Sequence, residues 1–303
     1  MLETRVIETR GGVSLRCGVW PSGEGGRGVC ALLDGQTEFL EKYEEVAGEL
    51  CARGFTVAAL DWRGQGASDR ALPDHRKAHV ADFAQYDEDL RAFLAHVVAP
   101  LDPRQPVALA HSMGGHILLR ALHAMPGSFA AAAMTAPLIE ADTRSYPAWV
   151  ARSVCSLQNI SGHKSDWVWG MQERDPLSMR FEDNLVTSDR ARFERARAAL
   201  KNNPELRLCG PTWGWLEAAY RSMALVRSPG FAEAITTPML ITGAGRDRIV
   251  RTAATRKLAV RLAHTTYVEL EDSEHEILME NDSIRARFWD AFDAFVGKTC
   301  PSL

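Results

Sequence analysis

The amino-acid sequence predicts an α/β fold, with a mostly parallel central sheet flanked by helices and one helical insertion. Patterns typical of strands and helices alternate from residue 29 to residue 137. The alternation stops over residues 138–232 and then resumes. Such alternation is typical of parallel sheets, because parallel neighbours need crossover connections that are usually helices. We therefore expect a core made of residues 1–137 and 233–303, with residues 138–232 forming an inserted helical lid.

The first part of the chain shows a hairpin followed by strands and helices in turn. Alternating residues over 5–20, interrupted at Gly11-Gly12, suit a hairpin turn. Apolar residues on one face predict a helix over 39–50, and Gly54 stands where a C-terminal cap would be. The other elements expected here are strands over 29–33, 55–60 and 107–111, helices over 80–98 and 112–125, and a strand that ends near Pro137.

The segment 138–232 shows no clear strand pattern, only polar turns and helical stretches such as 190–200. After it, the pattern of the first part returns. The elements expected there are a strand over 238–243, a helix over 252–263, a strand over 265–270 and a final helix with Ile284, Phe288, Phe292 and Phe295 on one side. The two outer parts of the chain must therefore complete one sheet.

The composition excludes several classes of protein. With 46% hydrophobic residues, 303 residues can bury a large core, and a net charge of -4 gives no reason to expect a nucleic-acid partner. The six cysteines are scattered without metal-ligand spacing, so we expect free thiols and no metal. The N-terminus lacks the apolar core of a signal peptide, and no window approaches the roughly 18 apolar residues of a membrane span. We expect a cytoplasmic protein; peripheral membrane contact and the oligomeric state stay open.

Ser112 stands in the stretch Ala110-His111-Ser112-Met113-Gly114, between an expected strand and an expected helix. The pattern is typical of a nucleophile elbow, with Ala110 in place of the commoner first glycine. Small neighbours are needed there because the helix start and the adjacent strand come close to the turn. The alternative is that Ser112 only caps the helix. The strand-to-helix context favours a nucleophile whose hydroxyl lies at a helix N-terminus.

A serine of this kind needs an acid and then a histidine later in the chain. Asp247 follows the strand over 238–243, and His275 follows the strand over 265–270. Both would lie at the carboxyl ends of parallel strands, where such sites form. Asp142 and Asp272 are rival acids.

Two further histidines lie near Ser112 in the sequence. We expect His111 to point away from Ser112 and to have a supporting role. His116 falls on the expected helix, and the sequence assigns it no role.

An oxyanion hole should use two backbone N–H groups, that of Met113 and one from the loop after the strand over 29–33. In that loop Gln36 is the expected donor, and Gly35 allows close approach of the backbone. An ordinary strand-to-helix loop is the alternative.

These motifs resemble the α/β-hydrolase superfamily, and within it the bacterial lysophospholipases that are similar to monoacylglycerol lipases. The resemblance covers nearly the whole chain, through DGQTEFLEKY, LDWRGQGASD, AHSMGG, NLVTSD, GPTWGW, GAGRDRIV and SEHEILME. It implies an α/β-hydrolase fold, a Ser112-Asp247-His275 triad, and an oxyanion hole formed by Gln36 and Met113. The chain departs from the family pattern at Ala110 and at Asp34, which replaces a histidine. We regard the loop DWRGQGASD as scaffold.

The insertion is rich in residues that could contact an acyl chain. Five of the eight tryptophans lie there. The segment also carries 13 Lys/Arg against 11 Asp/Glu, which is a slight excess of basic residues. A lid over an acyl chain needs adaptable apolar surface, although most of these side chains would equally suit the lid's own core. The residues expected to contact substrate are Gly35, Trp149, Trp169, Trp213 and Ile249.

The sequence therefore predicts a serine hydrolase of lipid-like carboxylic esters, with a lysophospholipid or monoacylglycerol as substrate and no cofactor. A short-chain carboxylesterase or a thioesterase could use the same triad, because a fold does not determine a substrate. A non-catalytic ligand-binding homologue is a more distant alternative, since all three triad members are present.

Overall fold

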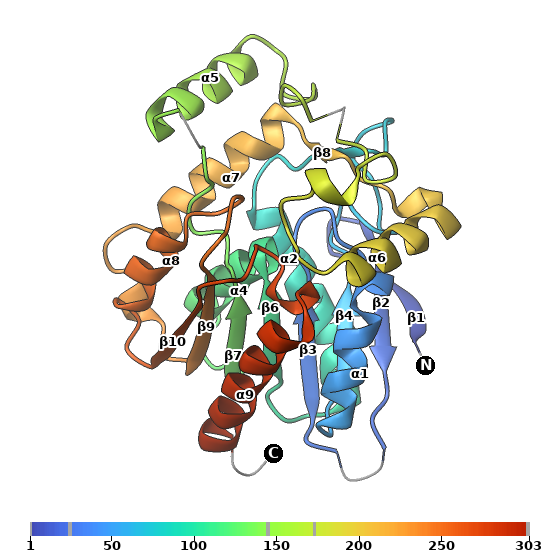
Figure 1. Ribbon diagram of the computed structural model, residues 1–303, viewed down its shortest axis with the longest axis vertical. Coiled ribbons are helices and arrows are strands. Elements are labelled where there is room, and N and C mark those ends of the chain that lie inside the picture. The colour runs from blue at the N-terminus through green and yellow to red at the C-terminus, as the bar shows by residue number, and fades with distance from the viewer. Residues whose placement is uncertain (1, 24–25, 144–145, 172–173, 301–303) are drawn as a thin grey trace.

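The computed structural model describes residues 2–23, 26–143, 146–171 and 174–300 (Figure 1). Within them, one eight-stranded sheet forms the centre of the molecule. Only β2 runs antiparallel to its neighbours, so the predicted mostly parallel sheet is confirmed. In spatial order the strands are β1 (Glu3–Glu8), β2 (Ser14–Trp20), β4 (Thr56–Leu60), β3 (Val29–Leu33), β6 (Val107–His111), β7 (Ala131–Thr135), β9 (Met239–Ala244) and β10 (Thr265–Leu270).

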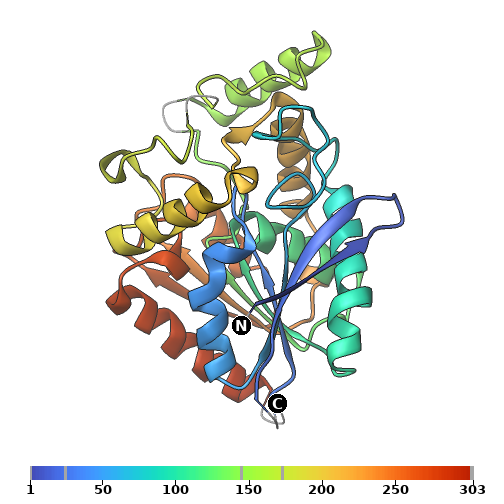
Figure 2. The ribbon, with the colours of Figure 1, turned by 90° about the vertical axis from the view of Figure 1, so that its right-hand side faces the viewer.

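Helices cover both faces of the sheet. Figure 2 shows the sheet nearly edge-on, with α1 and α9 on one face and α2 and α4 on the other. The helices outside the segment 138–232 are α1 (Glu44–Ala52), α2 (Ala84–Phe93), α3 (Ala99–Leu101), α4 (Ser112–Ala124), α8 (Thr252–Ala259) and α9 (Asp282–Thr299), with shorter helical turns over Leu40–Tyr43, Leu94–Val98, Ala232–Ala234 and Ile277–Met279.

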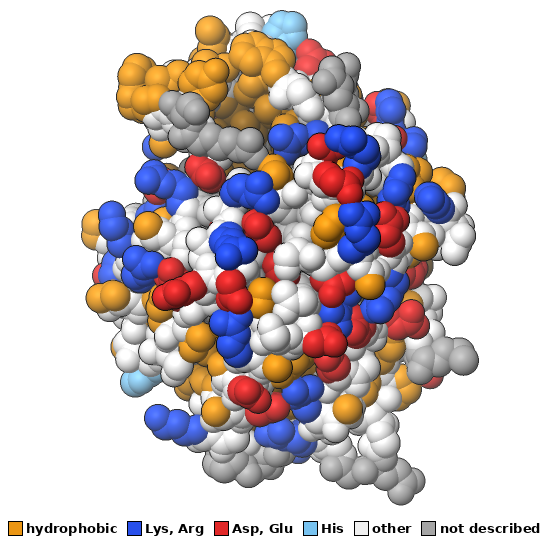
Figure 3. Space-filling view, viewed as in Figure 1, with side chains coloured by type: hydrophobic (Ala, Val, Ile, Leu, Met, Phe, Trp, Pro, Cys, Tyr) orange, Lys and Arg blue, Asp and Glu red, His pale blue; other side chains and the backbone are white. Residues whose placement is uncertain are grey.

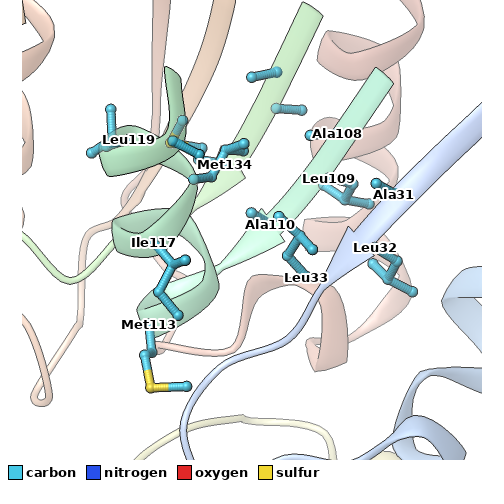
Figure 4. Close-up of a cluster of buried hydrophobic side chains, with 14 of the residues drawn as sticks. Ala31, Leu32, Leu33, Ala108, Leu109, Ala110, Met113, Ile117, Leu119 and Met134 are labelled. Atoms are coloured by element: carbon cyan, nitrogen blue, oxygen red, sulfur yellow. The ribbon is translucent and has the colours of Figure 1, made fainter. Parts of the chain in front are cut away.

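The core lies between the central strands and α4. Every residue of β3, β6 and β7 is buried, which agrees with parallel strands covered on both faces. Figure 4 shows Met113 and Ile117 projecting from α4, with Ala108 and Ala110 on the adjacent strand β6. Full burial of a side chain such as Ile117 contributes about 1.5–3 kcal/mol, and the small alanines leave room for α4 to pack closely. The packing therefore holds the start of α4 rigidly against the end of β6.

The segment 138–232 leaves the sheet after β7 and returns before β9. In Figure 1 it lies above the carboxyl ends of the parallel strands. Its elements are α5 (Ala148–Ile160), a turn over Phe181–Asp183, α6 (Arg190–Asn202), a turn over Pro204–Leu206, β8 (Gly210–Pro211) and α7 (Trp213–Val226).

Two local features differ from the expected elements. The two-residue strand β8 pairs in parallel with β5 (Lys77–Ala78), and two residues are too short to show a strand period in the sequence. The helix expected to start at Val80 begins instead at Ala84, whose N–H donates to Asp82 Oδ1 at 2.8 Å. In the described part of the chain, no helix has the length and apolarity needed to cross a bilayer.

Candidate active site

Ser112 lies at the point where β6 ends and α4 begins. Its φ of 48° is in the left-handed region, which is strained for a residue other than glycine. Gly114 makes the turn feasible, because a Cβ there would stand 2.3 Å from the carbonyl oxygen of Leu33. The small residue after the serine is therefore a steric requirement of this turn, as the sequence pattern predicts.

The structure brings Ser112, His275 and Asp247 into one chain of hydrogen bonds. His275 Nε2 lies 2.9 Å from Ser112 Oγ, and His275 Nδ1 lies 2.7 Å from Asp247 Oδ2. Asp247 Oδ1 accepts the backbone N–H groups of Ile249 and Val250, each at 2.8 Å. These contacts orient the carboxylate, and the carboxylate orients the imidazole so that Nε2 faces the serine.

Burial and charge shift the pKa values of His275 and Asp247 in opposite directions. The side chains of His275 and Asp247 are 6% and 1% exposed. Burial opposes protonation of His275, but the charge of Asp247 and its hydrogen bond outweigh burial and raise the pKa of the imidazole. Burial likewise opposes ionisation of Asp247, whereas His275 and the two backbone donors bring the net pKa of the carboxyl below its ordinary value. The arrangement therefore favours an ionised carboxylate that stabilises an imidazolium.

The rival acids make other contacts. Asp272 is 47% exposed and pairs with Arg287 at 2.5 Å. The backbone N–H of Asp142 donates to the carbonyl of Ile249 at 2.9 Å. Of the three acids weighed from the sequence, Asp247 is the one whose carboxylate bonds to His275.

The two histidines near Ser112 are buried and neutral. Burial lowers the pKa of His111 to about 4 and that of His116 to about 3. The His111 Nδ1 atom lies 3.0 Å from Thr135 Oγ1, and its ring centroid is 4.8 Å from that of His275. His116 donates from Nδ1 to the carbonyl of Leu138 at 2.7 Å, and its Nε2 lies 2.6 Å from Ser222 Oγ. His111 thus packs beside the candidate base, and His116 links α4 to α7.

The loop from Asp34 to Glu38 lies against Ser112. A Cβ added to Gly35 would stand 3.3 Å from the Ser112 Cβ, which shows how closely this backbone approaches the serine. Met113 is the second residue of α4, where backbone N–H groups have no partner within the helix. Gln36 follows Gly35 on this loop, so both expected donors lie on segments adjacent to the serine hydroxyl.

Side chains that the sequence pattern does not single out hold this loop in place. Trp62 Nε1 donates to the carbonyl of Asp34 at 3.1 Å, and Gln65 Nε2 donates to that of Gly35 at 2.8 Å. Both residues belong to the loop DWRGQGASD, which agrees with its interpretation as scaffold. The motif indicates a scaffold loop, but only the fold shows that Trp62 and Gln65 bind the backbone of Asp34 and Gly35.

The residues expected to contact substrate lie in different surroundings. Gly35 faces Ser112 as described, and Ile249 binds Asp247 through its backbone. Trp149 is 70% exposed and lines a cavity of about 430 Å³ between α5 and α7, and Ser112 is not among its lining residues. Trp169 is 67% exposed, whereas Trp213 is 5% exposed and packs edge-on against it, with 5.1 Å between the ring centroids.

Among the described residues, no cluster of three or more His, Cys, Asp or Glu is placed to hold a metal ion.

Comparisons with known proteins identify the family of this chain. A family model described as serine aminopeptidase, S33, matches residues 25–282. The chain is similar to lysophospholipase L2 of Escherichia coli (strain K12), with 32% identity over 265 residues that cover 85% of this chain and 77% of that protein. It is also similar to the monoacylglycerol lipase of Mycolicibacterium smegmatis, with 30% identity over 257 residues that cover 84% and 82%.

A solved structure shows the same fold. The crystal structure of a soluble variant of monoglyceride lipase from Saccharomyces cerevisiae, in complex with a substrate analog, matches with a TM-score of 0.77 at 18% identity. The match covers 99% of this chain and 95% of that one. The family model spans most of the chain, and the relatives align over most of their own lengths. The chain therefore belongs to the serine aminopeptidase S33 family of α/β-hydrolases and is an ester hydrolase.

Proposed function

We propose that this protein is a serine hydrolase of lipid-like carboxylic esters, with a lysophospholipid or a monoacylglycerol as its substrate. The observation that carries the proposal is the chain of contacts from Ser112 Oγ through His275 to Asp247, at 2.9 Å and 2.7 Å. A serine, a base and an orienting acid in this order activate a hydroxyl for attack on an acyl carbon. The names of the two relatives favour a lipid ester over other acyl compounds.

The proposed reaction has two halves. His275 Nε2 takes the proton of Ser112 as Oγ attacks the ester carbonyl carbon, and Asp247 stabilises the imidazolium that forms. The backbone N–H groups of Met113 and Gln36 bind the oxyanion. The intermediate collapses, and the leaving alcohol takes the proton from His275. Water then attacks the acyl-enzyme with His275 again as base, which releases the fatty acid and restores the serine.

The segment 138–232 is proposed as a lid that meets a lipid surface. Ser112 and His275 are only 8% and 5% exposed, and a covering segment that moves would let an acyl chain reach them. Within this segment, large apolar side chains stand in solvent, and Figure 3 shows hydrophobic surface gathered at the top of the molecule, where α5 lies. These exposed residues are Tyr146, Trp149, Leu157, Ile160 and Trp169, each at least 64% exposed.

The polar residues of this surface support the same proposal. Arg152 on α5 and Lys164 just after it are both exposed. Tryptophan and tyrosine with nearby basic side chains are typical of helices that lie at a lipid–water interface. We therefore propose peripheral contact with a membrane or lipid aggregate through α5 and the turn that follows it.

The deciding experiment measures fatty acid release by mass spectrometry. Lysophospholipids, monoacylglycerols and simple esters of graded chain length are incubated with the wild type and with Ser112→Ala. Release by the wild type alone, largest for long-chain lipid esters, supports the proposal. Release confined to short esters would assign a carboxylesterase instead, and equal release by Ser112→Ala would refute the nucleophile.

The same panel should contain a thioester and an amino-acid 4-nitroanilide, because the family model is described as a serine aminopeptidase. Hydrolysis of the anilide in preference to every ester would replace the lipid proposal by a peptidase. Hydrolysis of the thioester in preference to its oxygen ester would indicate a thioesterase.

A further inference from the structure

Lys42 forms a largely buried bridge between two carboxylates beside the candidate active site. Its Nζ lies 2.8 Å from Glu38 Oε1 and 2.7 Å from Glu276 Oε1. The side chain of Lys42 is 11% exposed, and those of Glu38 and Glu276 are 3% and 14% exposed. One ammonium group thus satisfies two carboxylates that are 238 positions apart in the sequence.

The two ends of the bridge belong to the two loops that the proposed reaction needs. Glu38 Oε2 accepts the backbone N–H of Gly35 at 2.5 Å and the hydroxyl of Tyr43 at 2.6 Å. Gly35 immediately precedes the expected oxyanion donor Gln36. Glu276 immediately follows His275 in the loop after β10. We call the loop from Asp34 to Glu38 the oxyanion loop. The bridge therefore connects the oxyanion loop to the loop that carries the candidate base, His275.

Stability alone is a weak explanation for such a bridge. Removing charges from water costs several kcal/mol per ion, and apolar replacements of buried ion pairs are often neutral or stabilising. A largely buried ion triad is better explained where it imposes a geometry that apolar packing would leave loose. The bridge also lies close to the site, because a Cβ on Gly35 would meet both Glu38 Oε2 at 2.8 Å and the His111 ring at 3.0 Å.

We propose that Lys42 is a positioning residue that holds the oxyanion loop and the His275 loop at the separation the reaction requires. The proposal rests on the proposed function, because it assigns Lys42 a purpose only if His275 and Gln36 act on an acyl group. Lys42 itself touches neither the substrate nor the reacting atoms.

Electrostatics agree with this placement. Burial opposes ionisation of Glu38, but Lys42 and His111 together with the hydrogen bonds bring its pKa to about 2. Burial raises the pKa of Glu276 above its ordinary value, although Lys42 acts against this. In both carboxyls the charge of Lys42 favours ionisation against the effect of burial, which agrees with a bridge made of ion pairs.

The test compares Lys42→Met with Lys42→Arg and with Arg120→Met in the full-length protein. Arg120 is a matched control, because its side chain is also 11% exposed and binds a carboxylate, that of Asp87, away from both loops. The assay is steady-state hydrolysis of a water-soluble 4-nitrophenyl ester, with thermal unfolding measured for each variant.

Lys42→Met should lower kcat about 10²-fold, because misplacement of reacting groups by about 1 Å can cost that much. KM should change less than about threefold, since the ground-state contacts remain. Lys42→Arg should recover most of the lost kcat, because it can bind both carboxylates. Arg120→Met should lower the unfolding temperature to a similar extent while kcat stays within about threefold of the wild type.

A folded Lys42→Met variant with kcat near the wild-type value would overturn the proposal, as would an equal loss of kcat in Arg120→Met. If Lys42→Met does not fold, Glu276→Gln decides, because it keeps the side-chain volume and removes the charge. It should then lower kcat at least about tenfold with little change in KM, and an unchanged kcat would refute the bridge. Ester hydrolysis that persists in Ser112→Ala would instead show that the proposed function itself has failed.

Discussion

Replacing Asp247 by asparagine tests the proposed triad at its most specific contact. Asp247 Oδ1 accepts two backbone N–H groups, from Ile249 and Val250, and asparagine has only one oxygen to offer. That oxygen should keep both backbone contacts, so the amide NH2 takes the place of Oδ2 and faces His275 Nδ1. Nδ1 must then accept a hydrogen bond, which moves the imidazole proton to Nε2. Nε2 would donate to Ser112 Oγ instead of accepting its proton, and the base is lost.

The expected loss is large and confined to turnover. The same change of tautomer in a serine triad lowers kcat by about 10⁴. At 1.36 kcal/mol for each factor of ten, this corresponds to about 5.4 kcal/mol of transition-state stabilisation. The fold should persist, because both backbone hydrogen bonds to the side chain remain.

Hydrolysis of a water-soluble 4-nitrophenyl ester, measured together with circular dichroism, checks this result. Asp142→Asn is the matched control, since it is the same substitution at the rival acid, and its kcat should stay within about threefold of the wild type. An Asp247→Asn variant that retains more than about a tenth of the wild-type kcat would refute the reasoning. So would a loss in Asp142→Asn as large as that in Asp247→Asn.

Two further predictions concern pH and the lipid surface. Because Asp247 and neighbouring carboxylates outweigh burial and raise the pKa of His275, kcat/KM should fall as pH decreases through a midpoint above the ordinary histidine value of about 6.5. A midpoint at or below that value in the pH profile would contradict the electrostatics of the site. Trp149→Ser and Ile160→Ser should each weaken co-sedimentation with vesicles of phosphatidylcholine and phosphatidylglycerol about tenfold, without changing hydrolysis of a soluble ester. Val260→Ser, at the 84% exposed residue that caps the C-terminus of α8, is the control. Equal vesicle binding by all three variants and the wild type would reject the proposed surface.

Much of the fold was predictable because its signals are local. The spacing of hydrophobic residues and the positions of Gly and Pro predicted the core strands and most helices to within a few residues. Gly54, expected at the end of the first helix, takes a positive φ of 89° after α1. The strand pair β5 and β8 was not predictable, because a two-residue strand has no period and its partner is more than 130 positions away. The start of α2 was misplaced because Val80 and Phe83 continue the apolar pattern of the helix but lie before its first residue, Ala84.

The sequence by itself determined the local chemistry of the site: a serine in a tight turn with small neighbours, and an acid and a histidine each following a strand. Such features depend on backbone sterics and on the order of elements along the chain. The sequence predicted Asp247 as the acid, with Asp142 and Asp272 as rivals, and only the tertiary structure shows the contact of Asp247 with His275. It alone also showed that Lys42 joins Glu38 to Glu276, a contact across 234 residues of sequence. These contacts depend on which strands become neighbours in the sheet. Local sequence patterns do not specify that arrangement, because it is set by packing between residues far apart in the chain.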